Sequence, residues 1–258
     1  MKKGDFKFCK DKINEFLNKN NKDIDFLKDF SFLEFRNSDR YFDYKEYYYS
    51  EGHEDNFQLA RFIYIVLWGY RSNNDYAIPC LNNAWDSFGE NLYCGETINT
   101  YSTLIGENDE KIKVTLSKKE QDILKSFREK YLTIGNFMVL PKQKPIGNAQ
   151  TLNQIKGSLY YNDLADKFYF DLFESKILDA YAHENRLKAN DFCKKFFLEP
   201  YFDLTNGKCK PKIIFNHSFR ENGNTYKDFI IDYATKAINI INYRAERICA
   251  ILKDRLKS

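Results

Sequence analysis

The sequence predicts a mainly α-helical protein with small β elements, that is, an α+β fold in which one helical domain carries a short β ribbon or hairpin. Apolar residues recur at helical spacing over several long stretches. Two Asn-Gly steps, which favour tight hairpin turns, lie within residues 201–226. No linker rich in Pro, Gly and Ser divides the 258 residues, so we expect residues 1–258 to form a single domain.

The N-terminal part predicts helices on either side of a tyrosine-rich tract. Charged and apolar residues alternate over residues 10–35, which favours one or two short amphipathic helices. Residues 36–50 are typical of a loop or an edge, and packing of residues 1–50 as an appendage stays open. Residues 54–70 begin with acidic side chains and carry apolar residues three and four apart, which predicts a buried helix ending near Gly69.

The clearest helix begins after Ser117. Ser117-Lys-Lys-Glu120 fits a capping box, in which two side chains satisfy backbone amides at the helix start. An apolar stripe then runs to Tyr131. We expect Gly135 to end this helix in the left-handed conformation, and residues 138–140 to continue as a short strand.

The C-terminal half predicts further helices around a β ribbon. Apolar spacing indicates helices over residues 158–178 and 186–198. Residues 201–226 carry the Asn-Gly steps and predict the ribbon. Residues 226–256 repeat apolar side chains at helical spacing, which predicts a long helix with one face buried by its neighbours.

Composition and cysteine spacing indicate a cytoplasmic protein. Aromatic residues make up 17% of the chain, and the many Lys and Asn residues are typical of an AT-rich bacterial genome. The six cysteines lie far apart without a C-x-x-C pair, and the N-terminus lacks the apolar core of a secretory signal, so we expect reduced thiols. No window approaches the ~18 apolar residues of a membrane span, so no membrane partner is expected.

The charge distribution is uneven although the net charge is only +3. Residues 51–116 carry 4 basic and 10 acidic side chains, residues 117–160 carry 8 and 3, and residues 208–258 carry 11 and 5. Two basic regions predict a face that attracts a nucleic acid or a nucleotide. The alternative is that the acidic segment neutralises them within the fold.

Sequence motifs disfavour several kinds of site. The three histidines are remote from one another and lack zinc-binding spacing, so we expect no metal site. No phosphate-binding loop, dinucleotide-binding fingerprint or nucleophile elbow occurs. The sequence therefore identifies no cofactor, and it leaves open whether the protein is an enzyme.

His217 and Asp163 are the catalytic candidates. His217 follows the short apolar run 213–215, and a histidine exchanges protons near neutral pH. The alternative is a hydrogen-bonded structural histidine. Asp163 precedes Glu174-Ser-Lys176, and an acid followed by E-x-K is typical of metal-dependent nucleases. For Asp163 the alternative is a solvated helix face.

Four segments, in order along the chain, resemble a bacterial protein family without an established reaction. The family is marked by G-[DE]-T-x-N-[ST]-[FY] and T-x-G-N-F segments and by an aspartate-rich aromatic helix. The resemblance covers about residues 90–255 and departs at Ala245, where the family has glycine. The matching segments are "GETINTYSTL" (95–104), "FREKYLTIGNFMVLP" (127–141), "IKGSLYYNDLADKFYFDLF" (155–173) and "INIINYRAERICAIL" (238–252).

The resemblance implies a shared fold and a shared pocket lined by small polar groups, Gly135 and Asp163 among them. Asn136 in particular is expected to lie beside the segment that starts at Gly95. Together with two lysines of the following loop, the expected substrate-binding residues are Gly95, Thr97, Asn99, Asn136, Lys142 and Lys144.

Two functions follow as predictions. The first is a cytoplasmic bacterial protein that binds a nucleotide or a nucleic acid, with hydrolysis and a role in phage defence as extensions of that prediction. The alternative is a non-catalytic protein-interaction or structural module, for which a homo-oligomer stays open.

Overall fold

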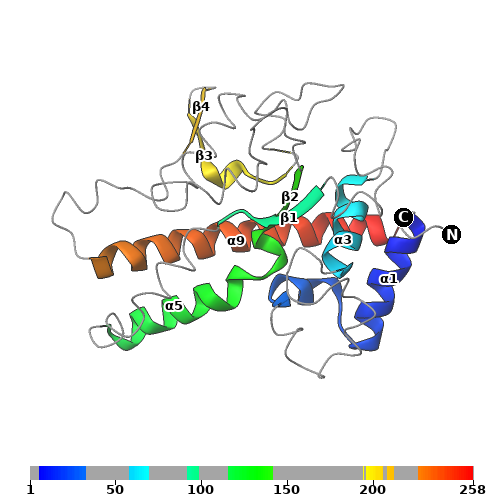
Figure 1. The fold of residues 1–258 in the computed structure, drawn as a ribbon, viewed down its shortest axis with the longest axis horizontal. Helices are drawn as coiled ribbons and strands as arrows, with labels where there is room; N and C mark the ends of the chain where they lie inside the picture. The colour runs from blue at the N-terminus through cyan, green and yellow to red at the C-terminus, as the bar shows by residue number, and fades with distance from the viewer. Residues whose placement is uncertain are drawn as a thin grey trace, which may run out of the picture.

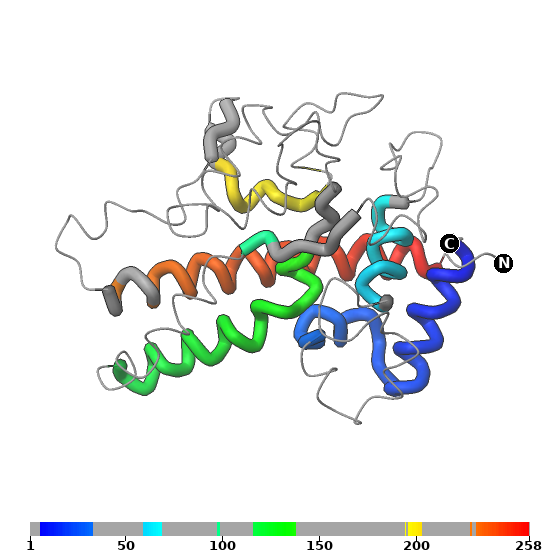
Figure 2. Tube along the Cα trace, viewed as in Figure 1, coloured from blue at the N-terminus to red at the C-terminus, as the bar shows by residue number. Residues whose placement is uncertain are grey.

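The computed structural model describes residues 6–32, 58–69, 92–98, 116–141, 194, 196–205, 208–211 and 226–257. Helix α9 (Tyr226–Lys257) runs along the length of this part of the molecule, with α5 (Lys118–Tyr131) beside it (Figure 1). Helices α1 (Phe6–Lys19) and α3 (Gln58–Tyr64) lie near the C-terminal end of α9 (Figures 1 and 2). Helix α9 is therefore the element around which the others are arranged.

The N-terminal segment forms an amphipathic helix and a short 3-10 helix, as residues 10–35 predicted. Helix α1 buries the side chains of Cys9, Ile13, Phe16 and Leu17, which recur at helical spacing. The 3-10 helix η1 (Ile24–Lys28) follows and packs on α9. Aromatic rings then close this end of the core, in contacts between Phe16, Phe26, Phe30 and Phe32.

Helix α3 continues directly into the π-helix η4 (Ile65–Gly69), so the predicted end near Gly69 is confirmed. Every side chain from Leu59 to Trp68 is buried. The last carbonyls of this element accept from α9, because Arg255 Nη1 donates to Val66 O at 2.7 Å and also to Leu67 O. A helix end that lies against the core is thereby satisfied by a side chain.

Helix α5 begins at the predicted capping box. Ser117 N donates to Glu120 Oε2 at 2.6 Å, and Glu120 N donates to Ser117 Oγ at 3.4 Å. Its apolar side packs on α9, where the rings of Phe127 and Tyr233 lie 6.4 Å apart. The helix ends at Tyr131, three residues earlier than a terminator at Gly135 would place it, so that prediction is wrong.

Two short antiparallel strand pairs accompany the helices. Strand β1 (Leu92–Glu96) pairs with β2 (Phe137–Pro141), with Glu96 opposite Phe137. Strand β3 (Phe202–Thr205) pairs with β4 (Lys208–Pro211).

The predicted fold class, an α+β fold with a β ribbon, is wrong, because the described part of the chain is mainly helical. The Asn-Gly steps and β-branched runs favour extended backbone locally, but local preference does not decide which elements build the core. A two-stranded pair is marginally stable alone and buries little apolar surface, so the helices make up the core. The fold class is mainly α.

The buried apolar side chains of the described residues form one cluster that reaches from α1 to α9. Helix α9 has 32 residues, and at 1.5 Å per residue it is about 48 Å long. Its predicted buried face is confirmed, since Ala237, Ile241 and Ile248 are all 0% exposed. None of the helices within the described ranges is both long and apolar enough to cross a membrane. The single-domain organisation of residues 1–258 stays a prediction.

Candidate functional site

The structure places three of the eight predicted site residues. Gly95 lies in strand β1, Thr97 follows this strand, and Asn136 lies in the 3-10 helix η6 (Ile134–Asn136) that precedes β2. The pairing of β1 with β2 brings these segments together, although they are remote in sequence. The residues that lie outside the described part of the chain are Asn99, Lys142, Lys144, Asp163 and His217.

Asn136 forms the centre of this arrangement, and its side chain is fully buried. Its Oδ1 accepts from Thr97 Oγ1 at 2.8 Å and from Ile98 N at 2.9 Å. Its Nδ2 donates to Ile98 O at 3.2 Å and to Tyr131 O at 2.8 Å. An amide side chain offers two donors and two acceptor positions, so all four are used by the chain itself.

Tyr201 extends these contacts to a third segment. It belongs to the 3-10 helix η8 (Glu199–Tyr201), and its hydroxyl donates to Thr97 Oγ1 at 2.8 Å. Thr97 Oγ1 therefore accepts from Tyr201 and donates to Asn136, which makes a continuous chain of hydrogen bonds. We name Thr97, Asn136 and Tyr201 the polar clasp; its three side chains are at most 1% exposed.

Gly135 explains why the chain beside the clasp can lie directly on α9. A β-carbon at this position would overlap the carbonyl oxygen of Ile241 and lie 3.0 Å from the Ala245 Cβ. Glycine is therefore required by close approach of two backbones, and not by a left-handed conformation. Ala245 is a small residue that faces this contact.

Arg244, like Tyr201, is a residue of this region that the sequence did not predict. It is 0% exposed, and its guanidinium donates to Gly135 O, to Phe137 O at 3.0 Å and to Phe196 O at 3.2 Å. The positive charge of the guanidinium is thus stabilised by backbone carbonyls of two segments that lie beside the clasp. A signal was present, since Arg244 falls on the apolar stripe of α9, at helical spacing from Ile241 and Ile248.

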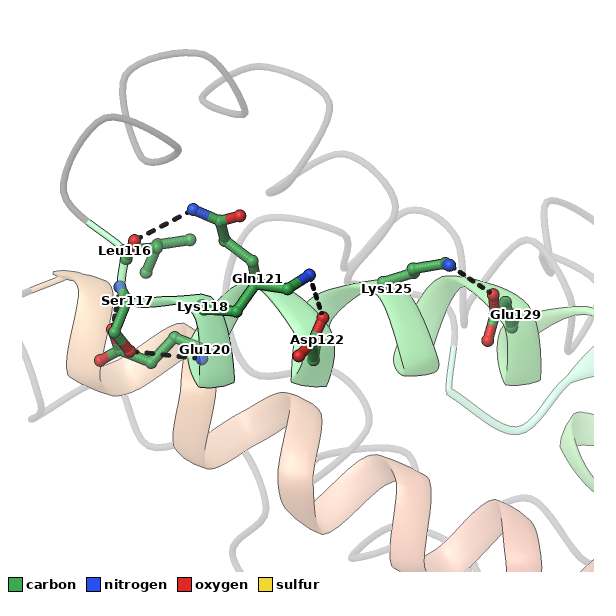
Figure 3. Close-up of polar contacts among 8 residues, drawn as sticks. All are labelled: Leu116, Ser117, Lys118, Glu120, Gln121, Asp122, Lys125 and Glu129. Carbon is green, nitrogen blue, oxygen red and sulfur yellow. Dashed lines mark hydrogen bonds and ion pairs between the residues drawn. The ribbon is translucent and has the colours of Figure 1, made fainter.

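Three lysines of α5 form ion pairs with carboxylates. Lys118 pairs with Asp122 at 2.7 Å and Lys125 with Glu129 at 3.7 Å, on the side of the helix away from α9 (Figure 3). Lys130 pairs with Asp29 of the N-terminal segment. Lys119 and Arg128 are exposed as well, so the exposed charged side chains of α5 comprise four basic and two acidic residues.

The charges of helix α9 are more evenly balanced. Arg244 and Arg255, which contribute to the basic count of residues 208–258, donate to carbonyls inside the molecule. Among the described side chains of α9, the exposed charged ones are four acidic and four basic residues: Asp228, Asp232, Glu246, Asp254, Lys236, Arg247, Lys253 and Lys257. The described exposed side chains of α9 therefore add no net positive charge to that of α5.

Cys249 lies on the buried side of α9 and is a free thiol. Burial raises the pKa of Cys249 to about 12, because the thiolate loses its hydration there. A thiol with so high a pKa is a poor nucleophile at neutral pH. The described part of the chain also contains no group of three His, Cys, Asp or Glu residues able to hold a metal ion.

The arrangement can therefore hold segments together, and its clasp contains no group that titrates near neutral pH. The roles predicted for His217, Asp163, Lys142 and Lys144 stay predictions, because these residues lie outside the described ranges. The resemblance to a bacterial family likewise stays a prediction. Comparison with protein-family models, with curated proteins and with solved structures gave no significant match to this chain.

Proposed function

We propose that this chain is a non-catalytic interaction or structural module, in which the polar clasp joins distant segments on a helical core. The observation that carries the proposal is the saturated amide of Asn136. Each of its hydrogen-bonding positions is taken by Thr97, Ile98 or Tyr131. An amide that reads a base edge needs a donor and an acceptor directed at the ligand. Asn136 directs both at its own chain.

The charge pattern supports the same proposal. Nucleic-acid binding rests on cations that face the phosphates, and affinity increases with the number of phosphates neutralised. Arg244 donates to carbonyls inside the molecule, and the described exposed charges of α9 balance. On α5, Lys118 and Lys125 have carboxylate partners, and the exposed cations beyond these pairs are Lys119 and Arg128.

The competing function is binding of a nucleotide or nucleic acid by a cytoplasmic protein, with hydrolysis and phage defence as its extensions. It rests on residues outside the described part of the chain, above all Lys142, Lys144, Asp163 and His217. No contact among the described residues favours it over the module.

A binding assay separates the two functions. The full chain is titrated at low salt into a fluorescent single-stranded RNA, a DNA duplex and a panel of mononucleotides. The module proposal expects no saturable binding to any of them. Binding that weakens by orders of magnitude between about 50 and 200 mM salt would overturn it.

Paired variants then locate any binding that does occur. Lys142→Ala/Lys144→Ala removes two cations of the predicted loop. Lys118→Ala/Lys125→Ala removes the same charge from α5, where both lysines form ion pairs. Loss of binding in the first variant alone would establish the predicted loop as the nucleic-acid contact. Light scattering after size-exclusion chromatography shows in the same samples whether the 30.7 kDa chain self-associates, which would identify a second copy as the partner.

A further inference from the structure

Residues 196–205, which we name the strap, contain one residue in an unusual backbone conformation. Phe197 has a φ of 57°, in the left-handed region, where the β-carbon of an L-residue crowds the next carbonyl oxygen. A bulky residue with positive φ is an outlier, and it persists only when its surroundings hold it there. The structure shows what holds Phe197.

Contacts from α9 and from η4 fix the start of the strap. The Arg247 guanidinium lies over the Phe197 ring, 5.8 Å from its centroid, and the Trp68 ring lies 6.2 Å from that of Phe197. The neighbouring Phe196 ring is 5.1 Å from Trp68, and Arg244 Nη2 donates to Phe196 O at 3.2 Å. Two arginines one helical turn apart thus hold two consecutive residues.

The next attachment of the strap is the clasp itself, through the hydrogen bond from Tyr201 to Thr97. These attachments differ in strength. Arg244 is buried, whereas Arg247 is exposed, and a cation–π contact at an exposed site is weak. The strap therefore combines a strained residue with one weak attachment directly over it. Figure 2 shows the first part of this segment, in yellow, beside α9.

We propose that the strap is a strained latch, which releases from α9 and from the clasp while the helices stay folded. Release lets Phe197 leave the left-handed region, and it uncovers the rings of Trp68, Phe196 and Phe197, each at most 5% exposed in the closed state. Local opening of this kind requires less free energy than global unfolding, and strain lowers it further. The proposal does not depend on the function proposed above, because it concerns the isolated chain.

Native-state hydrogen exchange on the full chain tests the latch. The amides of Phe197 and Tyr201 are expected to exchange through an opening that is insensitive to low denaturant, while the amide of Ile248 in α9 stays protected. Arg247→Ala should speed exchange of the two strap amides about two- to five-fold. Lys236→Ala, an exposed cation elsewhere on α9, should leave them unchanged. Equal opening free energy and equal denaturant dependence for strap and α9 amides in all three proteins would overturn the proposal.

A second pair of variants isolates the strain. Phe197→Ala and Phe197→Gly both remove the ring, but glycine adopts a φ of 57° without crowding. The Tyr201 amide is expected to exchange about five-fold faster in Phe197→Ala than in Phe197→Gly. Equal rates in these two variants would show that the backbone at Phe197 stores no strain, and the latch would then be rejected.

Discussion

Gly135 lies against the backbone of Ile241 so closely that a β-carbon at position 135 would overlap the Ile241 carbonyl oxygen. The two residues belong to elements far apart in sequence, the 3-10 helix before β2 and the middle of α9. Because the obstacle is a backbone atom in the middle of a long helix, it does not move aside as a side chain would.

Gly135→Ala is therefore expected to destabilise the protein by about 3 kcal/mol, because it overpacks a backbone contact. Urea unfolding followed by circular dichroism measures this loss. Ala245 is the other neighbour of the missing β-carbon, at 3.0 Å. The double variant Gly135→Ala/Ala245→Gly should not recover stability, since the Ile241 carbonyl stays in place. Full recovery in the double variant would show that Ala245 causes the restriction.

Asn136→Asp should destabilise the clasp in a pH-dependent way. The substitution keeps the shape but replaces Nδ2 by an oxygen that faces the carbonyls of Ile98 and Tyr131. We expect a loss of about 3 kcal/mol at pH 7, where the buried carboxylate oxygen that replaces Nδ2 faces two carbonyl oxygens instead of donors. Burial and the carbonyls raise the pKa of such a carboxyl above its unfolded value, so the protonated form is favoured in the folded state.

The sign of the pH dependence follows from linkage. A carboxyl with a raised folded pKa destabilises least below its unfolded pKa, near 4, and the loss grows as pH rises through the folded pKa. The difference in unfolding free energy between Asn136→Asp and wild type should therefore be smaller at pH 4 than at pH 7. A difference that is constant over this range would mean that position 136 is open to solvent.

The hydrogen bond between Tyr201 and Thr97 should show energetic coupling. Tyr201→Phe removes only the hydroxyl, and we expect a loss of about 1 kcal/mol. Thr97→Val removes the atom that accepts from Tyr201 and donates to Asn136. In a double-mutant cycle, the two losses should be non-additive by about 0.5–1.5 kcal/mol. Strict additivity would contradict the contact.

Cys249 should make the protein less stable in alkali. Its folded pKa is raised to about 12, above the unfolded value, so the unfolded chain releases this proton first. Stability is fully present below about pH 8.5 and falls as pH rises toward 12. Replacement by Ala should remove this part of the alkaline slope, as measured by thermal unfolding at stepped pH. In the native state at pH 8, iodoacetamide should leave Cys249 unmodified, and labelling at the rate of an exposed thiol would contradict its burial.

The sequence predicted the helices well, but it predicted the structural roles of single residues poorly. The capping box at Ser117 and the stripe of α9 are local patterns, and both predictions are confirmed. Glycine at position 135 is compatible with a left-handed turn or with a close approach, and only the tertiary structure distinguishes these reasons. The local explanation was the wrong one.

The site shows the same limit. Proximity of Asn136 to the segment after Gly95 was expected, and the hydrogen bonds to Thr97 and Ile98 establish it. The Asn136 amide is saturated because its Nδ2 donates to the carbonyls of Tyr131 and Ile98, and no sequence pattern predicts the positions of these carbonyls. The charge counts of whole segments have a related weakness, because they treat Arg244 as a surface cation. Arg244 instead donates to carbonyls about fifty and more than a hundred residues earlier in the chain.

The position of α9 in the chain has a consequence for synthesis on the ribosome. Helix α5 packs its apolar face on α9, an element that is translated after it. At about 5–20 residues per second, residues 132–257 take roughly 6–25 s to follow α5 out of the ribosome. During that interval the ring of Phe127 lacks its contact with Tyr233 of α9, so we expect a nascent chain of this protein to depend most on chaperones in this period.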